Sequence, residues 1–238
     1  MELFRALFAP PRHWLLVLLA AWIGTSLSER RLKAPLTAKQ VNDLLSYGVI
    51  GYFLGGRFFY ALENLPNVLA APWSLFSLQD MFSPWGAWLT AFLVFAISLQ
   101  RRKLPLLETL DTLTPFFATL LIGLSLANLA SGDGFGKETN VPWAWELWGA
   151  QRHPSQLYEL IASALTLGIL LRLNFSAPGA LFRRFLALTS GWVLFLQAFR
   201  GDSHLLPGGF RLEQVIAWGV LALSLWWIAQ EKKDVSHT

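Results

Sequence analysis

The chain has 238 residues, of which 54% are hydrophobic and only 14% are charged, against about 25% charged residues in an ordinary soluble domain. This balance argues against a soluble fold, whose surface needs more polar residues, and predicts an all-α protein that crosses a membrane several times. The absence of cysteine excludes disulfides, thiolate metal sites and a cysteine nucleophile on the protein itself. The net charge of +4 is compatible with nucleic-acid binding, but the basic residues cluster between apolar segments, so no nucleic-acid partner is predicted.

Seven apolar segments follow in chain order, each close to the ~20 residues that a membrane helix needs. They cover residues 13–28, 43–63, 84–100, 112–130, 155–173, 179–199 and 211–230. The first resembles a signal peptide in its Arg-containing flank, but no persuasive cleavage site follows, so a retained helix is predicted. No internal repeat divides the chain, and residues 1–238 are expected to form a single integral-membrane domain.

Basic residues are distributed unevenly between the connecting segments. Alternate connections and the C-terminal tail are rich in lysine and arginine, which predicts an N-terminus outside and a C-terminus inside the cell. Trp143, Trp145 and Trp148, which precede the fifth segment, are interpreted as anchors at headgroup level. The basic residues on the inner side are Arg30, Arg31, Lys33, Lys39, Arg101, Arg102, Lys103, Arg172, Arg183, Arg184, Lys232 and Lys233.

The run "RHPSQLYE", residues 152–159, opens the fifth segment. Pro154 suits the first position of a helix, so His153 is expected at the N-cap and Gln156 at the third helical position, as in a capping box. A helix N-terminus attracts anions, and Arg152 adds a positive charge beside it. Ordinary helix capping, together with a structural pair of glutamate and arginine, is the alternative interpretation.

Other polar residues interrupt apolar segments. Arg57 lies in the outer half of the second segment, where an arginine costs roughly 2.5–3.5 kcal/mol on insertion scales and usually faces a partner or a wet cavity. Gly55 and Gly56 beside it permit close approach of a helix or a lipid headgroup. Asn128 lies in the fourth segment, and Asp133 follows in a glycine-rich turn. A snorkelling arginine and a simple exit turn are the alternatives.

These polar groups are all predicted on the outer side. Together they suggest a cavity, open to the outer leaflet, that binds the phosphate of an anionic phospholipid. Nothing in the pattern argues for a metal or an organic cofactor. The predicted cluster comprises Arg57, Asn128, Asp133, Arg152, His153, Gln156, Tyr158, Glu159 and Arg200.

Three stretches carry a resemblance to a known family: "TAKQVNDLLSYGVIGYFLGGRFFYALEN", "GKETNVPW" and, most specifically, "RHPSQLYE". In these the chain resembles the bacterial prolipoprotein diacylglyceryl transferases, over roughly residues 12–200. The resemblance implies a multi-pass enzyme of the plasma membrane. Such an enzyme transfers the diacylglyceryl group of phosphatidylglycerol to the lipobox cysteine of a preprolipoprotein, and glycerol phosphate leaves. The nucleophile then belongs to the acceptor protein.

The resemblance also implies two groups of site residues. His153, Asp133 and Glu159 are expected to act as catalytic groups on the thiol proton. Asp133 stands where the family signature has a glutamate. The lipid substrate and its phosphate are expected to be bound by Arg57, Asn128, Gly136, Arg152, Gln156, Tyr158 and Arg200.

Five positions depart from the family pattern. Leu15 replaces a tyrosine, and Pro84 replaces a histidine. Ser125 and Val193 replace arginines, and Gln197 replaces a glutamate. An active, divergent transferase is the main prediction. A degenerate paralogue that binds lipid or lipoprotein without transfer is the alternative, and a small transporter or channel is a third hypothesis, which the scarcity of polar residues in the cytoplasmic halves disfavours.

Overall fold

The computed structural model describes residues 2–32, 36–73, 82–174 and 177–236, with the side chains of residues 3–231 within these ranges. Lys33 and the side chains of Lys232 and Lys233 therefore lie outside the described part. The chain divides into two compact units, one of Met1–Arg31 with Leu110–Thr238 and one of Leu32–Thr109.

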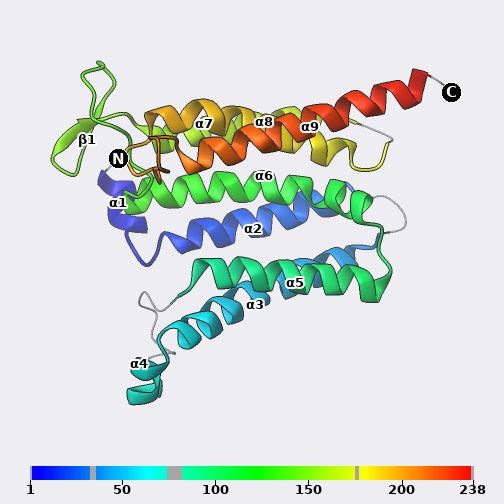
Figure 1. The fold of residues 1–238 in the computed structure, drawn as a ribbon, viewed down its shortest axis with the longest axis horizontal. Coiled ribbons are helices and arrows are strands. Elements are labelled where there is room, and N and C mark those ends of the chain that lie inside the picture. The colour runs from blue at the N-terminus through cyan, green and yellow to red at the C-terminus, as the bar shows by residue number, and fades with distance from the viewer. Residues whose placement is uncertain (1, 33–35, 74–81, 175–176, 237–238) are drawn as a thin grey trace. The chain divides into compact units, whose positions relative to one another are not determined.

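A helix occupies each of the seven apolar segments predicted from the sequence (Figure 1). These helices are α2 (Trp14–Glu29), α3 (Ala38–Glu63), α5 (Pro84–Arg102), α6 (Leu106–Ser131), α7 (Ser155–Arg172), α8 (Ala180–Leu196) and α9 (Leu212–Ser236). Two described stretches, all of α6 and Leu212–Glu231 of α9, are long and apolar enough to cross a membrane by length and composition, and α2 is a shorter apolar helix. The predicted all-α class is confirmed.

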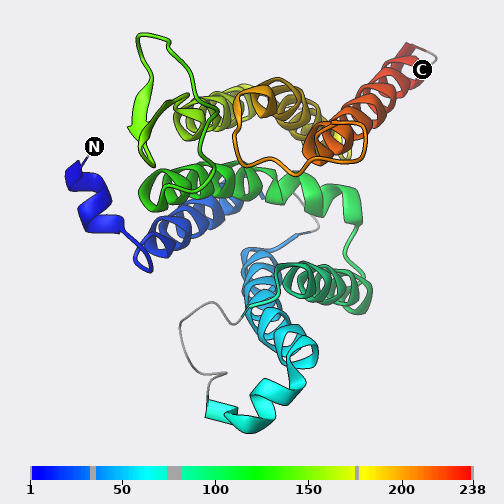
Figure 2. The ribbon, with the colours of Figure 1, turned by 60° about the vertical axis from the view of Figure 1, so that its left-hand side comes forward.

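Short elements occur between the predicted segments. The only described strands form a two-stranded antiparallel hairpin between α6 and α7. Figure 1 shows this hairpin past the end of α6, and Figure 2 shows it above the same end. The short elements are α1 (Glu2–Phe8), α4 (Leu65–Ala70), β1 (Trp145–Leu147), β2 (Ala150–Arg152) and the 3-10 helix η2 (Gln197–Phe199).

In the first unit, α2 and α6 pack with their backbones in close contact. A Cβ atom added at Gly123 would lie 2.4 Å from the Cβ of Ala20, and one added at Gly24 would lie 2.9 Å from the Cα of Phe116. Small residues at a helix interface permit such close approach, which is typical of helices that pack within a membrane. Figure 1 shows the two helices side by side.

An acidic residue of α6 fixes the start of α8. The carboxylate of Asp111 accepts hydrogen bonds from the main-chain N–H groups of Gly179 and Phe182, each at 2.8 Å. These amides at a helix N-terminus have no partner within the helix, and a carboxylate there also interacts favourably with the helix dipole. Asp111 therefore joins α6 to α8 through the main chain.

The C-terminal end of α7 is closed by a basic residue. Arg31 donates to the carbonyl of Leu173 at 2.9 Å and also to the carbonyl of Leu171. The last carbonyls of a helix lack partners within it and attract cations. Arg31, predicted as part of a cytoplasmic basic cluster, thus also completes the hydrogen bonding of α7.

Close packing between α3 and α5 organises the second unit. A Cβ added at Gly55 would lie 2.2 Å from Oγ1 of Thr90, and one added at Gly86 would lie 2.2 Å from the Cβ of Phe59. A Cβ added at Gly56 would lie 2.2 Å from the ring of Phe82. The expectation that Gly55 and Gly56 permit close approach is confirmed, and the approaching groups belong to α5 and the residue two positions before it.

Large apolar side chains point outward along several helices. Trp22 on α2 is 70% exposed, Leu165 on α7 is 62% exposed and Trp218 on α9 is 66% exposed. Soluble monomers rarely show extended apolar surfaces of this kind, whereas helices that face lipid require them. The exposed apolar side chains of these helices agree with the membrane protein inferred from composition.

The capping box expected at the start of α7 is absent. The N-cap residue is Pro154, and no side chain caps the helix. His153 instead continues an extended segment, because its main-chain N–H donates to the carbonyl of Lys137 at 3.0 Å. The side-chain amide of Gln156 donates to the main-chain carbonyl of Asp133 at 3.0 Å rather than to the cap. The placement of His153 at the cap was wrong by one residue, since the helix can begin only after this pairing ends.

Candidate active site

The loop that follows α6 is tied to the first turn of α7. Gly132 and Gly134 have φ angles of +85° and +65°, which glycine adopts without steric cost. The hydroxyl of buried Ser155 donates to the carbonyl of Gly134 at 2.6 Å, and Gln156 donates to the carbonyl of Asp133. The predicted glycine-rich turn is present, and it holds this loop against the start of α7.

Arg200, just after η2, forms ion pairs with two carboxylates. Its Nη1 lies 2.8 Å from Oε1 of Glu159, and its Nε and Nη2 each lie 2.9 Å from the carboxylate of Asp202. We call these three residues the ion triad. The side chains of Arg200 and Glu159 are only 19% and 10% exposed. Burial lowers the pKa of Arg200, but the hydrogen bonds that it donates to Asp202 and the charge of Glu159 more than offset this, so the pKa is raised and the guanidinium stays charged.

An amide group lies next to the ion triad. A Cβ added at Gly134 would lie 3.2 Å from Nη2 of Arg200 and 3.3 Å from Nδ2 of Asn128. The guanidinium and the amide therefore flank the same glycine. Gly136 forms an isolated antiparallel bridge with Arg200, which fixes the main chain of both residues relative to each other. The structure thus brings Asn128, Glu159 and Arg200 together from α6, from α7 and from the end of η2.

His153 and Tyr158 form a second polar group near the start of α7. Nδ1 of His153 lies 3.4 Å from the hydroxyl of Tyr158, and Nε1 of Trp143 donates to that hydroxyl at 2.7 Å. The ring of Phe199 packs edge-on against His153 with centroids 5.1 Å apart. The interpretation of Trp143 as a headgroup anchor misses this bond, which orients the tyrosine hydroxyl next to the histidine.

Arg152 is engaged by the hairpin and the loop. Its guanidinium donates to the carbonyls of Leu147 and Gly136 at 3.1 and 3.3 Å. It also pairs with Glu138 at 3.1 Å and lies over the ring of Phe135, 5.0 Å from the centroid. Phosphate binding by Arg152 stays a prediction; these three hydrogen bonds use three of the five N–H donors of its guanidinium.

Two further predicted residues have clear positions in this loop. Gly136 is in such close contact with His153 that a Cβ would lie 2.1 Å from the histidine carbonyl oxygen. Asp133 is exposed, and its carboxylate accepts a hydrogen bond from Ser131 at 2.7 Å. Gly136 is therefore required by packing, whereas the side chain of Asp133 is exposed to solvent.

Arg57 belongs to the second unit, so its grouping with Asn128 and Arg200 stays a prediction. Its Nη1 is buried and has no hydrogen-bond partner among the described residues. A buried guanidinium nitrogen without a partner is costly, which is the condition expected of a group that binds an anionic ligand.

Two of the departures from the family pattern precede residues of the site by three positions in the sequence, Ser125 before Asn128 and Gln197 before Arg200. Ser125 is buried in α6, and its hydroxyl donates to the carbonyl of Leu121 at 2.9 Å. Gln197 is buried at η2, and its Oε1 accepts from the hydroxyl of Ser203 at 3.0 Å. Each is satisfied by a local neutral hydrogen bond in place of the family's charged group.

The other three departures are also compatible with their local structure. Pro84 is the first residue of α5, a position where its missing N–H costs nothing. Leu15 lies near the start of α2 and is 55% exposed. Val193 lies within α8. Pro84 thus suits its position in α5, whereas nothing in the structure explains Leu15 or Val193.

Arg211 is a site residue whose role the sequence did not predict. Its Nη1 donates to the carbonyls of Gln197 and Arg200 at 2.6 and 2.9 Å and to the hydroxyl of Ser203 at 2.5 Å. It therefore closes the turn that carries Arg200. Its place in "RLEQ", just before an apolar segment, was the only signal, and it does not distinguish such a residue from a solvated one.

Comparison with known proteins identifies the relatives of this chain. Residues 11–230 match the model of the family described as prolipoprotein diacylglyceryl transferase. The chain is 32% identical over 180 residues to a phosphatidylglycerol–prolipoprotein diacylglyceryl transferase of Bordetella bronchiseptica, which covers 71% of this chain and 69% of the relative. It is 30% identical over 201 residues to a protein of the same name from Oleidesulfovibrio alaskensis, covering 81% and 75%.

Proposed function

Because the chain belongs to the prolipoprotein diacylglyceryl transferase family, we propose that it transfers the diacylglyceryl group of phosphatidylglycerol to a lipobox cysteine of a preprolipoprotein. The sulfur attacks the glyceryl carbon that carries the phosphate. A carbon–sulfur bond forms, and the carbon–oxygen bond breaks. Glycerol phosphate leaves with the electron pair, and the thiol proton passes to a base.

The observation that carries this proposal is the ion triad beside Asn128. Negative charge accumulates on the phosphate as the carbon–oxygen bond breaks, and fixed donors aimed at that charge stabilise the transition state. Arg200 and Asn128 flank the same glycine, so both can donate to one phosphate group. Arg57 supplies a second cation in this proposal, with Gly136, Arg152 and Gln156 shaping the site. Because the triad carries one positive and two negative charges, the phosphate takes the place of a carboxylate at Arg200.

The proton of the acceptor thiol needs a base, because a free cysteine has a pKa of about 8.5. His153 is suited to this role, since Tyr158 and Trp143 fix the neighbouring hydroxyl. Asp133, exposed at the same loop, and Glu159, paired with Arg200, are the other candidates. We assign the proton to His153 first. Unlike Glu159, its ring is bound by a neutral group rather than by a cation, and unlike Asp133 it lies beside the oriented hydroxyl of Tyr158.

We further propose seven membrane spans in one domain over residues 1–238, with the N-terminus outside and the C-terminus inside the plasma membrane. The site then faces the outer leaflet. The 18 residues of α7 span about 27 Å at 1.5 Å per residue, close to the ~30 Å hydrocarbon thickness. The ion triad lies near its first turns, and Arg31 binds at its last turn. This separation supports a polar outer site and a basic inner end.

The direct test incubates purified protein in phosphatidylglycerol vesicles with a lipobox peptide and measures the peptide mass. The expected result is a mass increase of one diacylglyceryl group on the cysteine, and none on a peptide with serine at that position. Absence of product, while a related transferase works in parallel, would contradict the proposal. Retained binding of phosphatidylglycerol in that case would favour a paralogue that binds lipid without transfer.

Restoring the family's side chains gives a second test. Pro84→His and Ser125→Arg introduce the histidine and the arginine that the family has at these positions. We expect the natural chain to be active without them. If transfer appears only in the double variant, then the natural chain has lost the reaction and kept the scaffold.

A further inference from the structure

The hairpin of β1 and β2 is anchored to the candidate site by a strained tryptophan. The two residues of its turn, Trp148 and Gly149, have φ angles of +55° and +72°. Positive φ at both positions defines a type I′ turn, which normally prefers Asn-Gly, and a tryptophan there is strained. Nε1 of Trp148 donates to the carbonyl of Gly132 at 3.1 Å, and its ring packs on that glycine. The hairpin tip is thereby fixed to the loop that carries the candidate site.

The outer edge of β1 is open. In this hairpin Glu146 faces Gln151, and Leu147 faces Ala150 next to the turn. The pair next to a two-residue turn exchanges hydrogen bonds, so the main-chain groups of the following pair point away from each other. On the β2 side, the carbonyl of Gln151 accepts from the N–H of Thr139 at 2.9 Å. On the β1 side, no described residue bonds to the main-chain N–H or carbonyl of Glu146.

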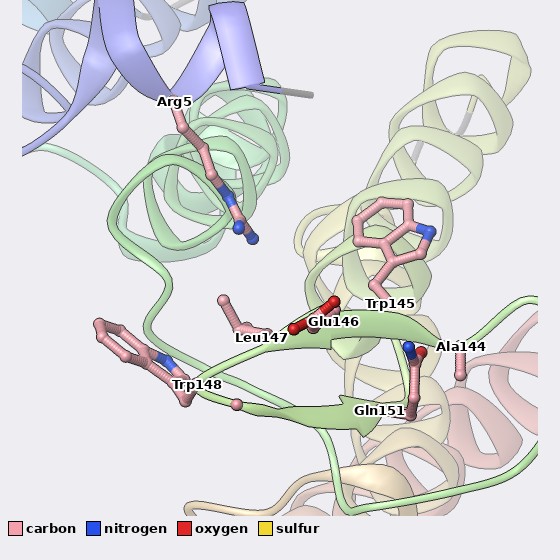
Figure 3. Close-up of a pocket in the computed structure, with 8 residues that line it drawn as sticks. Arg5, Ala144, Trp145, Glu146, Leu147, Trp148 and Gln151 are labelled. Atoms are coloured by element: carbon pink, nitrogen blue, oxygen red, sulfur yellow. The ribbon is translucent and has the colours of Figure 1, made fainter.

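A hollow of about 670 Å³ lies beside the hairpin. Arg5 of α1 borders it, held by a hydrogen bond from its Nε to the carbonyl of Leu129 at 3.3 Å. Figure 3 shows the end of the Arg5 side chain directed at the hairpin, with Trp145 and Trp148 at the sides. The hollow therefore offers a cation and apolar surface beside the strand whose outward main-chain donor and acceptor at Glu146 have no partner among the described residues. The lining residues are Arg5, Ala144, Trp145, Glu146, Leu147, Trp148, Gly149 and Gln151.

We propose that the edge of β1 binds an extended segment of the acceptor polypeptide as an added strand, with Arg5 bound to one of its carbonyl or carboxylate oxygens. Main-chain N–H and carbonyl groups at one residue of an open strand match the alternating groups of an extended peptide. A phospholipid phosphate has no N–H donor for the carbonyl of Glu146. The proposal rests on the proposed function, which supplies a polypeptide substrate. The contact of Trp148 with Gly132 places the bound segment next to the loop of the candidate site.

Proline at position 146 tests the strand pairing without disturbing the hairpin. The N–H of Glu146 points outward, and proline is tolerated on edge strands at such positions. Glu146→Pro should raise the KM for a lipobox peptide about 3–10-fold, the effect of one net hydrogen bond, with no matching rise in the KM for phosphatidylglycerol. Glu146→Ala keeps the N–H and should give a smaller rise. Equal peptide KM values in the wild type and both variants would overturn the proposal.

Hydrogen exchange of the wild-type protein gives a readout that needs neither a variant nor transfer. Adding lipobox peptide, without phosphatidylglycerol, should slow exchange of the Glu146 amide several-fold and leave that of Gly191 in α8 unchanged. Unchanged exchange at Glu146 with saturating peptide would overturn the strand pairing. Slowed exchange in a protein that forms no product would overturn the transfer reaction alone, so the two failures are distinguishable.

Discussion

Arg200 and Glu159 are 41 residues apart in the sequence, yet their side chains form an ion pair at 2.8 Å. The pair joins the end of η2 to the second turn of α7 at a site that is largely closed to water. The same guanidinium binds Asp202 through two further nitrogens. Arg200 therefore determines both the packing of this region and the charge that a phosphate would meet.

Removing the guanidinium should affect stability and activity together. Arg200→Ala leaves Glu159 largely buried without its cation. We expect a loss of about 2 kcal/mol in the free energy of unfolding, less than the roughly 3–5 kcal/mol for a fully buried pair because both groups are partly exposed. Transfer should fall roughly a hundredfold or more. Thermal unfolding in detergent and the peptide mass assay measure the two effects.

The control is Arg101→Ala, which removes an exposed arginine of α5. It should leave both the unfolding temperature and transfer close to wild type. If Arg200→Ala behaved like this control, Arg200 would be a surface residue without a role in phosphate binding.

Neutralising Asp202 should have the opposite effect on lipid binding. The ion triad has a net charge of −1, because one guanidinium faces two carboxylates. Asp202→Asn raises this to zero and frees part of the guanidinium, so the KM for phosphatidylglycerol should fall a few-fold. Initial rates at varied lipid content in mixed micelles measure it. A rise in KM would instead mean that Asp202 holds Arg200 in the geometry that binds phosphate.

The pH dependence of lipid binding should change when Arg200 is replaced by histidine. The pKa of Arg200 is raised above its already strongly basic unfolded value, so its stabilising charge is present throughout the neutral range and is lost only at strongly basic pH. Titration of Arg200 should therefore not change the wild-type KM for the lipid between about pH 6 and pH 10. In Arg200→His the imidazole loses its charge as pH rises above about 7, and lipid binding should weaken there. If the lipid KM depended on pH in the same way in both proteins, the charge at position 200 would not contribute to lipid binding.

Gly136 should not tolerate a methyl group. Gly136→Ala brings Cβ to 2.1 Å from the carbonyl oxygen of His153, so the loop must move. We expect destabilisation of about 1–3 kcal/mol and reduced transfer, measured by thermal unfolding and the mass assay. Gly168→Ala in α7 is the matched control, because a Cβ there meets nothing within 4 Å, and alanine favours a helix by about 0.5–1 kcal/mol. Equal unfolding temperatures for the two variants would refute the close contact.

The helices were predictable because each depends on a long apolar run. Predicted segments such as 84–100 and 155–173 differ from α5 and α7 by no more than two residues at either end. The hairpin was not predictable, because its turn uses Trp-Gly instead of the usual Asn-Gly, and its strands are three residues long. The N-cap of α7 was predicted one residue too early, at His153, because the pairing of His153 with Lys137 is a contact between distant residues that no local pattern encodes.

For the candidate site, the sequence predicted which residues are polar and on which helix end they lie, but not how they pair. Glu159 and Arg200 were both expected in the cluster, and their ion pair depends on how α7 and η2 pack. Asp202 lies in a loop and Arg211 at the edge of an apolar segment, positions where a charged residue is usually solvated, so the sequence did not indicate their roles. Their roles follow from a turn that brings Asp202 to Arg200 and from three acceptors that converge on Arg211.

The bonds from Arg31 to the last carbonyls of α7 affect how the orientation of this protein can be examined. Experiments that invert a membrane protein by deleting loop charges assume that each charge acts only during insertion. Arg31 does not meet this assumption, because its deletion would also remove the hydrogen bonds to the last carbonyls of α7 and lower the yield of folded protein. Reporter fusions that probe orientation should therefore remove Arg30 or Lys39 and keep Arg31, so that a change of sidedness is not confused with misfolding.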